Sequence, residues 1–354
     1  MSDMLDIEKM RDNAVNSYVT AAHGIFGDLG NSALLKTIDT LIKIYRNIDP
    51  SVHKNPIIAY RYIDPLRDID KSKYISSVLS PDHITTELDK PCAIEISGST
   101  TLFISNYDDF DPTELSRDAI VYLFKDQTEF FFIGGKIYEV INPLGQLHAS
   151  IFSRPSYKSL MKALKDYGIR QASNSTCQIL KNIWTDNNRL ILCNKPEHIM
   201  RNSLTQFLYS VLQDAEVRPE QNVDDSHPVD IKITWNLTNR RAIIEIKWLG
   251  KSLSDTVGGY TSYTEARARS GAKQLADYLD SSHEFGPTVQ TRGYLVIFDA
   301  RRKNMHSIPA SLSYDDGFHY ANKEINFNPL YHIQRSDFEE PVRFFMAPLC
   351  HEVI

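Results

Sequence analysis

Two short, strongly apolar segments joined by a polar loop constrain the fold of this chain more than any other feature. In Val229–Trp235 and in Arg241–Trp248, apolar side chains alternate with polar or charged ones. This period of two is the pattern of β-strands. The four residues 236–239 between them fit a hairpin loop. The sequence therefore predicts an antiparallel pair of strands inside a domain.

Two acidic residues lie at matched positions on this pair. If residues 236–239 form the loop, Asp230 falls directly opposite Glu245, and Lys247 shares a face with Glu245. Carboxylates side by side on a sheet repel each other, whereas a divalent cation between them reverses the sign, and Mg²⁺ prefers such oxygen ligands. We therefore expect Asp230 and Glu245 to bind Mg²⁺ or Mn²⁺. Lys247 is expected to hold water and to offset charge that develops on a phosphoryl group.

The order of elements around this pair is α-β-β-β-α-β, and it spans about residues 196–304. Pro196 can open a first helix, whose apolar residues share one face. These residues are Leu204, Leu208, Val211 and Leu212. A short strand follows at Glu216–Glu220. After the strand pair come a second helix from about Thr264 to Leu279 and a buried strand from Thr291 to Ala300.

The residues Pro228-Val229-Asp230, followed by Glu245-Ile246-Lys247 within this order, resemble the PD-(D/E)XK nuclease superfamily. The sequence departs from the motif because Val229 separates the proline from the aspartate. The resemblance implies a restriction-endonuclease-like core and a metal-dependent phosphodiesterase. It also makes a role as a bacterial restriction or anti-phage effector plausible.

A second motif on the second helix is similar to the Q-x-x-x-Y motif of RecB-like nucleases. Gln274 and Tyr278 carry it, and helical spacing places both on one stripe with Arg267 and Gly271. A neighbouring apolar stripe is expected to pack on the sheet. It consists of Ala268, Ala272, Leu275 and Leu279. The resemblance implies that Gln274 and Tyr278 orient substrate or water beside the carboxylate pair.

Many members of the superfamily add a glutamate from the first helix as a further metal ligand. Glu197 and Glu220 are the candidates here, with Gln206 as a third. Two basic clusters border the expected centre and could follow a phosphate backbone, although a charge run is more often a solvated face. The first comprises Arg267, Arg269 and Lys273, and the second comprises Arg301, Arg302 and Lys303.

The first 190 residues read as a mixed α/β domain of unknown type. A helical region from Ile7 to Asn47 precedes short strand-like segments between Pro56 and Val140, where Gly134-Gly135 fits a hairpin turn. No motif discloses a function. We expect this part to recognise a substrate feature, a regulatory protein or a small effector.

The whole chain is expected to be a mixed α/β protein of two domains, 1–190 and 191–354. Its N-terminus lacks the basic and then apolar pattern of a signal peptide, so we expect a cytoplasmic protein without a membrane segment. The four cysteines form no C-x-x-C pair, which favours reduced thiols. The net charge of −6 argues against nucleic-acid binding by bulk charge alone.

The expected function is divalent-metal-dependent DNA hydrolysis, with endonuclease action favoured over exonuclease action. The first alternative is an inactive nuclease fold that binds nucleic acid or protein, and the intact Asp230, Glu245 and Lys247 argue against it. The second is an RNA-directed nuclease, for which the sequence offers no aromatic RNA-binding strand. The sequence leaves open the DNA specificity and whether the chain forms a homo-oligomer.

Overall fold

The computed structural model describes residues 7–81, 84, 88, 90–99, 101–140, 150–154, 156–222, 228–256, 258–284, 289–305 and 312–349. The chain is a mixed α/β protein, as predicted, and forms two compact units. The first comprises Met1–Lys158 and Leu237–Arg240, and the second comprises Ser159–Asn236 and Arg241–Ile354. Among the described residues, no helix has the length and apolar character that crossing a membrane would require.

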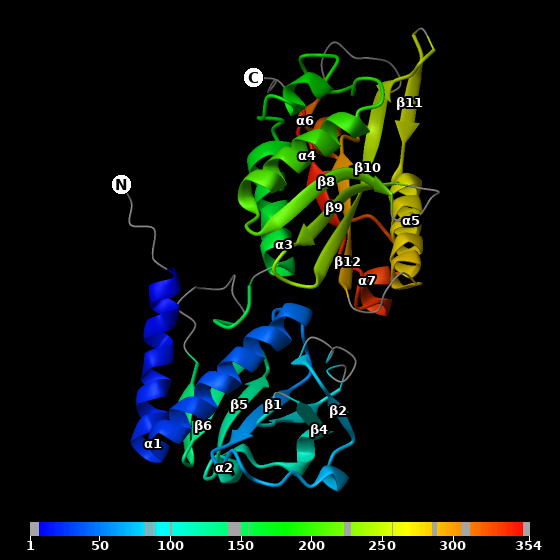
Figure 1. Ribbon diagram of the computed structural model, residues 1–354. Coiled ribbons are helices and arrows are strands. Elements are labelled where there is room, and N and C mark those ends of the chain that lie inside the picture. The colour runs from blue at the N-terminus through cyan, green and yellow to red at the C-terminus, as the bar shows by residue number, and fades with distance from the viewer. Residues whose placement is uncertain are drawn as a thin grey trace. The chain divides into compact units, whose positions relative to one another are not determined.

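The first unit is a seven-stranded mixed sheet with one long helix on it (Figure 1). Helix α1 (Ile7–Asn47) bends at Gly27, whose φ is +61°, and packs against β1, β5 and β6. The strand order is β2-β4-β3-β1-β5-β6-β7, and β1 and β3 run parallel. The elements after α1 are β1 (Ile57–Tyr62), β2 (Ser76–Val78), β3 (Cys92–Ile96), β4 (Leu102–Asn106), α2 (Pro112–Leu115), β5 (Ala119–Lys125), β6 (Thr128–Ile133) and β7 (Lys136–Glu139).

The hairpin turn predicted at Gly134-Gly135 is confirmed. Gly134 and Gly135 connect β6 to β7, and both have positive φ angles, +58° and +78°. Such angles suit a tight hairpin turn between antiparallel strands, and glycine adopts them without steric cost.

The second unit is a six-stranded sheet with helices on both faces. Its strand order is β13-β12-β10-β9-β8, and β11 pairs with the far end of β10. The chain order is α3 (Tyr157–Tyr167), α4 (Glu197–Val211), β8 (Ala215–Asn222), β9 (Pro228–Trp235), β10 (Arg240–Leu253), β11 (Tyr260–Tyr263), α5 (Glu265–Glu284), β12 (Gln290–Asp299), α6 (Tyr314–Phe318), α7 (Tyr331–Gln334) and β13 (Val342–Phe345). The predicted α-β-β-β-α-β order is confirmed, with β11 added.

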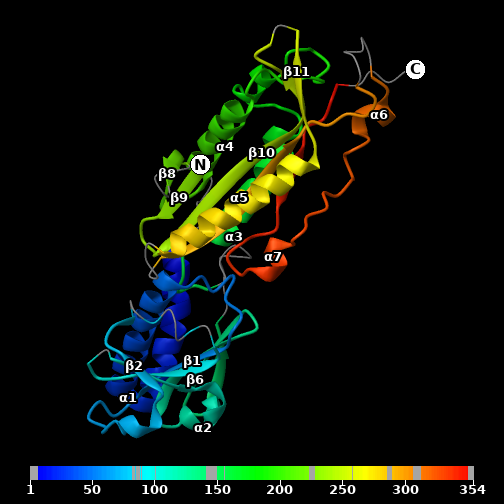
Figure 2. The ribbon, with the colours of Figure 1, turned by 90° about the vertical axis from the view of Figure 1, so that its right-hand side faces the viewer.

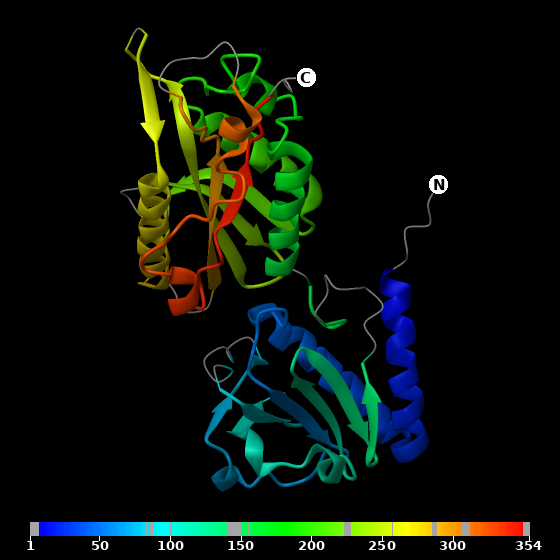
Figure 3. The ribbon, with the colours of Figure 1, turned by 180° about the vertical axis from the view of Figure 1, so that it is seen from behind.

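Two helical layers enclose this sheet, with α3 and α4 on one face and α5 on the other (Figures 1 and 2). Seen from behind, the red strand β13 lies beside the orange strand β12, with which it pairs in parallel (Figure 3). The apolar stripe of α5 is confirmed, because Ala268, Ala272, Leu275 and Leu279 are buried in one core with Leu295 and Ile297 of β12. The sheet centre therefore has water excluded from both sides.

Two details of the second unit differ from expectation. Val211 was placed on the buried face of the first helix, but it is 46% exposed because α4 ends there and Leu212 continues in extended conformation. The compact units divide after Lys158, earlier than the expected domain end at residue 190. Tyr167 at the end of α3 packs against Phe298 of β12 and Phe344 of β13, which places that segment in the second unit.

Candidate active site

Asp230 lies near the start of β9 and is 7% exposed. Its Oδ2 accepts a hydrogen bond of 2.7 Å from the backbone N–H of Ile246 on β10. Its Oδ1 accepts a hydrogen bond of 2.9 Å from Nη1 of Arg201, which belongs to α4. The sheet and the helix therefore both fix this carboxylate.

Glu245 and Lys247 lie two residues apart on β10, and both side chains are buried. The Lys247 ammonium donates a hydrogen bond to Oε1 of Glu245 and forms an ion pair with it. Glu245 is 2% exposed, so this bond lies in a low-dielectric environment where a charge-assisted contact is strong.

The surroundings of Asp230 and Glu245 shift the pKa values of both carboxyl groups. Burial raises the pKa of Glu245 to about 8, and the negative charge of Asp230 adds to the increase while Lys247 opposes it. Burial likewise raises the pKa of Asp230, against the lowering effect of the Ile246 N–H and of Arg201. The charge of Asp230 therefore acts on Glu245, as expected for a residue on the adjacent strand.

Glu197 in the first turn of α4 is the third acidic residue near this centre. Its charge raises the pKa of both Asp230 and Glu245. Its own carboxylate forms an ion pair of 2.8 Å with Arg267 of α5. Each of the three carboxyl groups thus has a basic partner, Arg201, Lys247 or Arg267.

Gly271 on α5 packs directly against the side chain of Lys247. A Cβ at this position would lie 2.5 Å from Cγ of Lys247 and 3.0 Å from its Cε. Real Cβ atoms do not approach so closely, so any larger residue would move the lysine. The stripe that carries Arg267, Gly271, Gln274 and Tyr278 therefore faces the candidate centre at Gly271.

Gln274 and Tyr278 join the start of β9 by a chain of hydrogen bonds. Gln274 Nε2 donates to the Tyr278 hydroxyl at 2.6 Å, and that hydroxyl donates to the carbonyl oxygen of Pro228 at 3.3 Å. Pro228 precedes Asp230 by two residues. The motif residues thus contact the strand that carries the aspartate.

The other two candidate ligands have different surroundings. Glu220 on β8 is exposed and forms an ion pair with Arg201, the arginine that also binds Asp230. Gln206 is exposed on α4.

The two basic clusters differ in exposure. Arg269 and Lys273 are exposed on α5, as a backbone-tracking surface requires. Arg301 and Arg302, expected on such a surface, are only 7% and 8% exposed. Arg301 is bound by Asp299 and Glu265, and Arg302 donates to backbone carbonyls, because the end of β12 turns them inward. Lys303 alone in this cluster is exposed.

The carboxyl groups of the site supply two of the oxygen ligands that a hard divalent cation needs. Among the described residues, no group of three or more His, Cys, Asp or Glu side chains is arranged to hold a metal ion. Magnesium typically uses one or two protein carboxylates and completes its shell with water and substrate oxygens. Asp230 and Glu245 supply such a pair, and within the described part of the chain Oε2 of Glu245 accepts no hydrogen bond.

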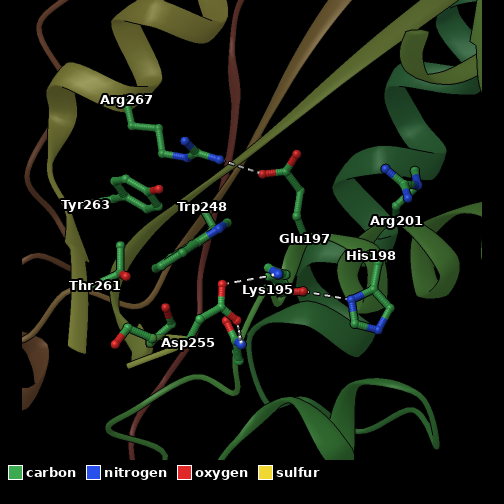
Figure 4. A pocket seen from close by; sticks show the side chains of 12 residues that line it. Lys195, Glu197, His198, Arg201, Trp248, Asp255, Thr261, Tyr263 and Arg267 are labelled. Carbon is green, nitrogen blue, oxygen red and sulfur yellow. Dashed lines mark hydrogen bonds and ion pairs between the residues drawn. The ribbon is translucent and has the colours of Figure 1, made fainter. Parts of the chain in front are cut away.

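A cavity of about 490 Å³ opens beside Glu197, between the start of α4, the end of β10, β11 and the start of α5 (Figure 4). Tyr263 stacks edge-on with Trp248 at 4.7 Å, and the Arg267 guanidinium lies 4.0 Å over the Tyr263 ring. Arg201 also lines the cavity and donates to Asp230, so it connects this cavity with the buried pair. The full lining is Asn194, Lys195, Glu197, His198, Arg201, Trp248, Ser252, Ser254, Asp255, Thr261, Tyr263 and Arg267.

Arg201 is the residue of this centre that the sequence did not single out. It follows Glu197 by one helical turn, and such an i, i+4 pair usually predicts a local ion pair. In the structure each of the two residues binds a partner on another element. Comparisons with protein-family models, with curated proteins and with solved structures give no match for this chain.

The fit of Gly271 against Lys247 gives a first prediction. Gly271→Ala should lower the free energy of unfolding by about 1 to 3 kcal/mol through overpacking, although alanine favours a helix over glycine by about 1 kcal/mol. The matched control is Ser270→Ala at the exposed neighbouring position, which should change the free energy of unfolding by no more than about 0.5 kcal/mol. Chemical denaturation of both variants measures the difference. A Gly271→Ala protein as stable as the control would show that Lys247 is not held there.

Proposed function

We propose that the second unit is a Mg²⁺- or Mn²⁺-dependent phosphodiesterase that cleaves DNA internally. The observation that carries this proposal is the buried pair Asp230 and Glu245 on adjacent strands, with Lys247 bonded to Glu245. Burying two carboxyl groups on adjacent strands, where the charge of Asp230 raises the pKa of Glu245, is costly for a structural sheet, and a cation-binding role gives a reason for it.

The chain's own residues divide the chemistry among them. Asp230 and Glu245 would hold the cation, which when bound polarises the phosphodiester and lowers the pKa of a coordinated water. The Lys247 ammonium offsets negative charge on the transferred phosphoryl group from a fixed, water-poor position. Gln274 and Tyr278 are positioning residues, because they hold the backbone two residues before Asp230.

DNA is the substrate that the surroundings favour. Three basic residues, Lys195, Arg201 and Arg267, line the 490 Å³ cavity against two acidic ones, Glu197 and Asp255. Arg269 and Lys273 extend the positive charge along α5. Positive groups around an acidic centre let a negatively charged backbone approach. The resemblance to restriction-type nucleases agrees with this choice, and the first unit would then supply recognition or control.

One observation favours a second candidate function, an inactive nuclease fold that binds nucleic acid. Because Arg201, Lys247 and Arg267 already bind the three carboxyl groups, each group has a basic partner without any metal. Such a protein would bind DNA equally well with and without a divalent cation and would not cleave it.

Paired substitutions on β10 test the proposal. Glu245→Gln and Lys247→Met should each lower the rate of DNA cleavage by at least about a hundredfold, since each removes charge stabilisation from the transition state. Only Glu245→Gln should also weaken Mn²⁺ binding, because the lysine is no ligand. Lys232→Met on β9, whose charged neighbours are Arg218, Arg241 and Glu216, is the matched control and should keep both properties. Wild-type cleavage by either β10 variant would refute the assignment.

The raised pKa of Glu245 gives a pH dependence with a definite sign. A carboxyl group with a pKa of about 8 is mostly protonated at pH 7, so a bound cation must displace that proton. Mn²⁺ affinity should therefore rise with pH, by up to about tenfold per unit below pH 8, and level off above it. Calorimetry at pH 7 in two buffers of different ionisation enthalpy should show proton release for wild type and none for Glu245→Gln. Buffer-independent heats for wild type would contradict this.

A further inference from the structure

A second cavity, of about 390 Å³, lies where the end of β10 passes the end of β12, and its lining is strongly basic. Lys251, Arg301, Arg302 and Lys303 line it, and none of its lining residues is acidic. This concentration of positive charge contrasts with the net charge of −6 for the whole chain.

The backbone conformation at Gly250 places Lys251 in the cavity wall. Gly250 has a φ of +126°, and a Cβ there would lie 2.7 Å from the carbonyl oxygen of Ala300. The N–H of Ala300 donates to the carbonyl of Leu249 at 2.8 Å, which joins the two strand ends. Only glycine permits this close approach, and the next residue, Lys251, then enters the cavity.

The basic side chains differ in how their charge is balanced. Arg301 is neutralised, because Asp299 binds it at 2.8 Å and Glu265 binds it at 2.9 Å. Lys251 instead donates to the carbonyl oxygen of Met305, and Arg302 donates to the carbonyl oxygens of Arg301 and Met346. A carbonyl is a good hydrogen-bond acceptor but carries no net charge.

The carboxylate of Asp316 binds a residue of the cavity wall but does not line the cavity itself. Asp316 accepts two hydrogen bonds from Nδ2 of Asn304, at 3.0 and 3.2 Å, and it does not line the cavity. Arg302 is 8% exposed, so its charge is held largely away from water. Lys251 keeps its net charge when it donates to a carbonyl, and an anion that enters the cavity would offset that charge.

We propose that this cavity binds a phosphate group, held by Lys251 and Lys303 with Arg302 behind them. Arg301, stacked 4.4 Å over Tyr320 and saturated by carboxylates, is a positioning residue that shapes the wall. Gly250 lies three residues beyond Lys247 on β10, or roughly 10 Å along a strand, about the axial rise of three nucleotides in duplex DNA. A backbone phosphate a few nucleotides from the cleaved one is therefore the expected source, and this choice rests on the proposed function.

The first arm of the test uses inorganic phosphate and the full chain in a chelating buffer. Calorimetry should show phosphate binding that Lys251→Met and Lys303→Gln each weaken by at least about tenfold, the effect of losing one charge-assisted hydrogen bond. Lys181→Gln, at an exposed lysine outside the cavity, is the control and should bind like wild type. Lys303 is exposed, so its substitution tests the cavity even if Lys251→Met fails to fold. Phosphate binding that is absent, or equal in all four proteins, would overturn the proposal.

The second arm distinguishes the source of the phosphate. In the same buffer, the dependence of DNA affinity on salt should fall by about one unit of slope for Lys251→Met or Lys303→Gln and stay unchanged for Lys181→Gln. A loss of phosphate binding with an unchanged salt slope would support the cavity as a site for a free phosphate ligand and overturn the DNA source. Neither arm needs cleavage, so an inactive protein that still binds phosphate would refute the proposed function alone.

Discussion

Everything at the candidate centre depends on how two carboxylates are kept out of water beside each other. Asp230 and Glu245 give up hydration, and the loss raises both pKa values. The structure compensates with the Ile246 N–H, Arg201 and Lys247, which stand where water would otherwise be. A divalent cation would therefore enter by exchange, since it must displace a proton or a basic side chain.

This exchange links metal binding to the surrounding cations. Arg267 and Arg201 line the 490 Å³ cavity and bind carboxylates of the centre at the same time. A cation held by Asp230 would release the Arg201 guanidinium from that carboxylate, and this group could then face the cavity. Because guanidinium groups bind phosphate well, occupation of the centre and binding of a phosphate backbone would support each other.

The parts of the fold that follow from local periodicity could be predicted from the sequence. The alternation around Asp230 and Glu245 predicted β9 and β10, and the apolar stripe of α5 predicted which side of that helix packs on the sheet. The end of β10 could not be predicted, because the strand continues past Trp248 through Gly250 to pair with β11, whose Tyr260–Tyr263 segment is largely polar. Short polar strands owe their conformation to their neighbours.

Charged residues were harder to predict than strands because their partners are chosen by tertiary structure. Arg301 and Arg302 resemble a solvated basic run, yet the end of β12 buries both. Arg201 has no motif around it, and only the position of α4 beside β9 brings it to Asp230. The residue at which the second unit begins could not be predicted for the same reason. Tyr167 belongs to that unit because it contacts Phe298 and Phe344, which lie far along the chain.

The most direct test of the account is incubation of the full chain with supercoiled plasmid in Mg²⁺, in Mn²⁺ and in a chelator. If Asp230, Glu245 and Lys247 form a metal-dependent endonuclease centre, nicked and linear plasmid should appear with either cation and disappear with the chelator. Unchanged plasmid under every cation, or the same products in the chelator, would contradict the central claim.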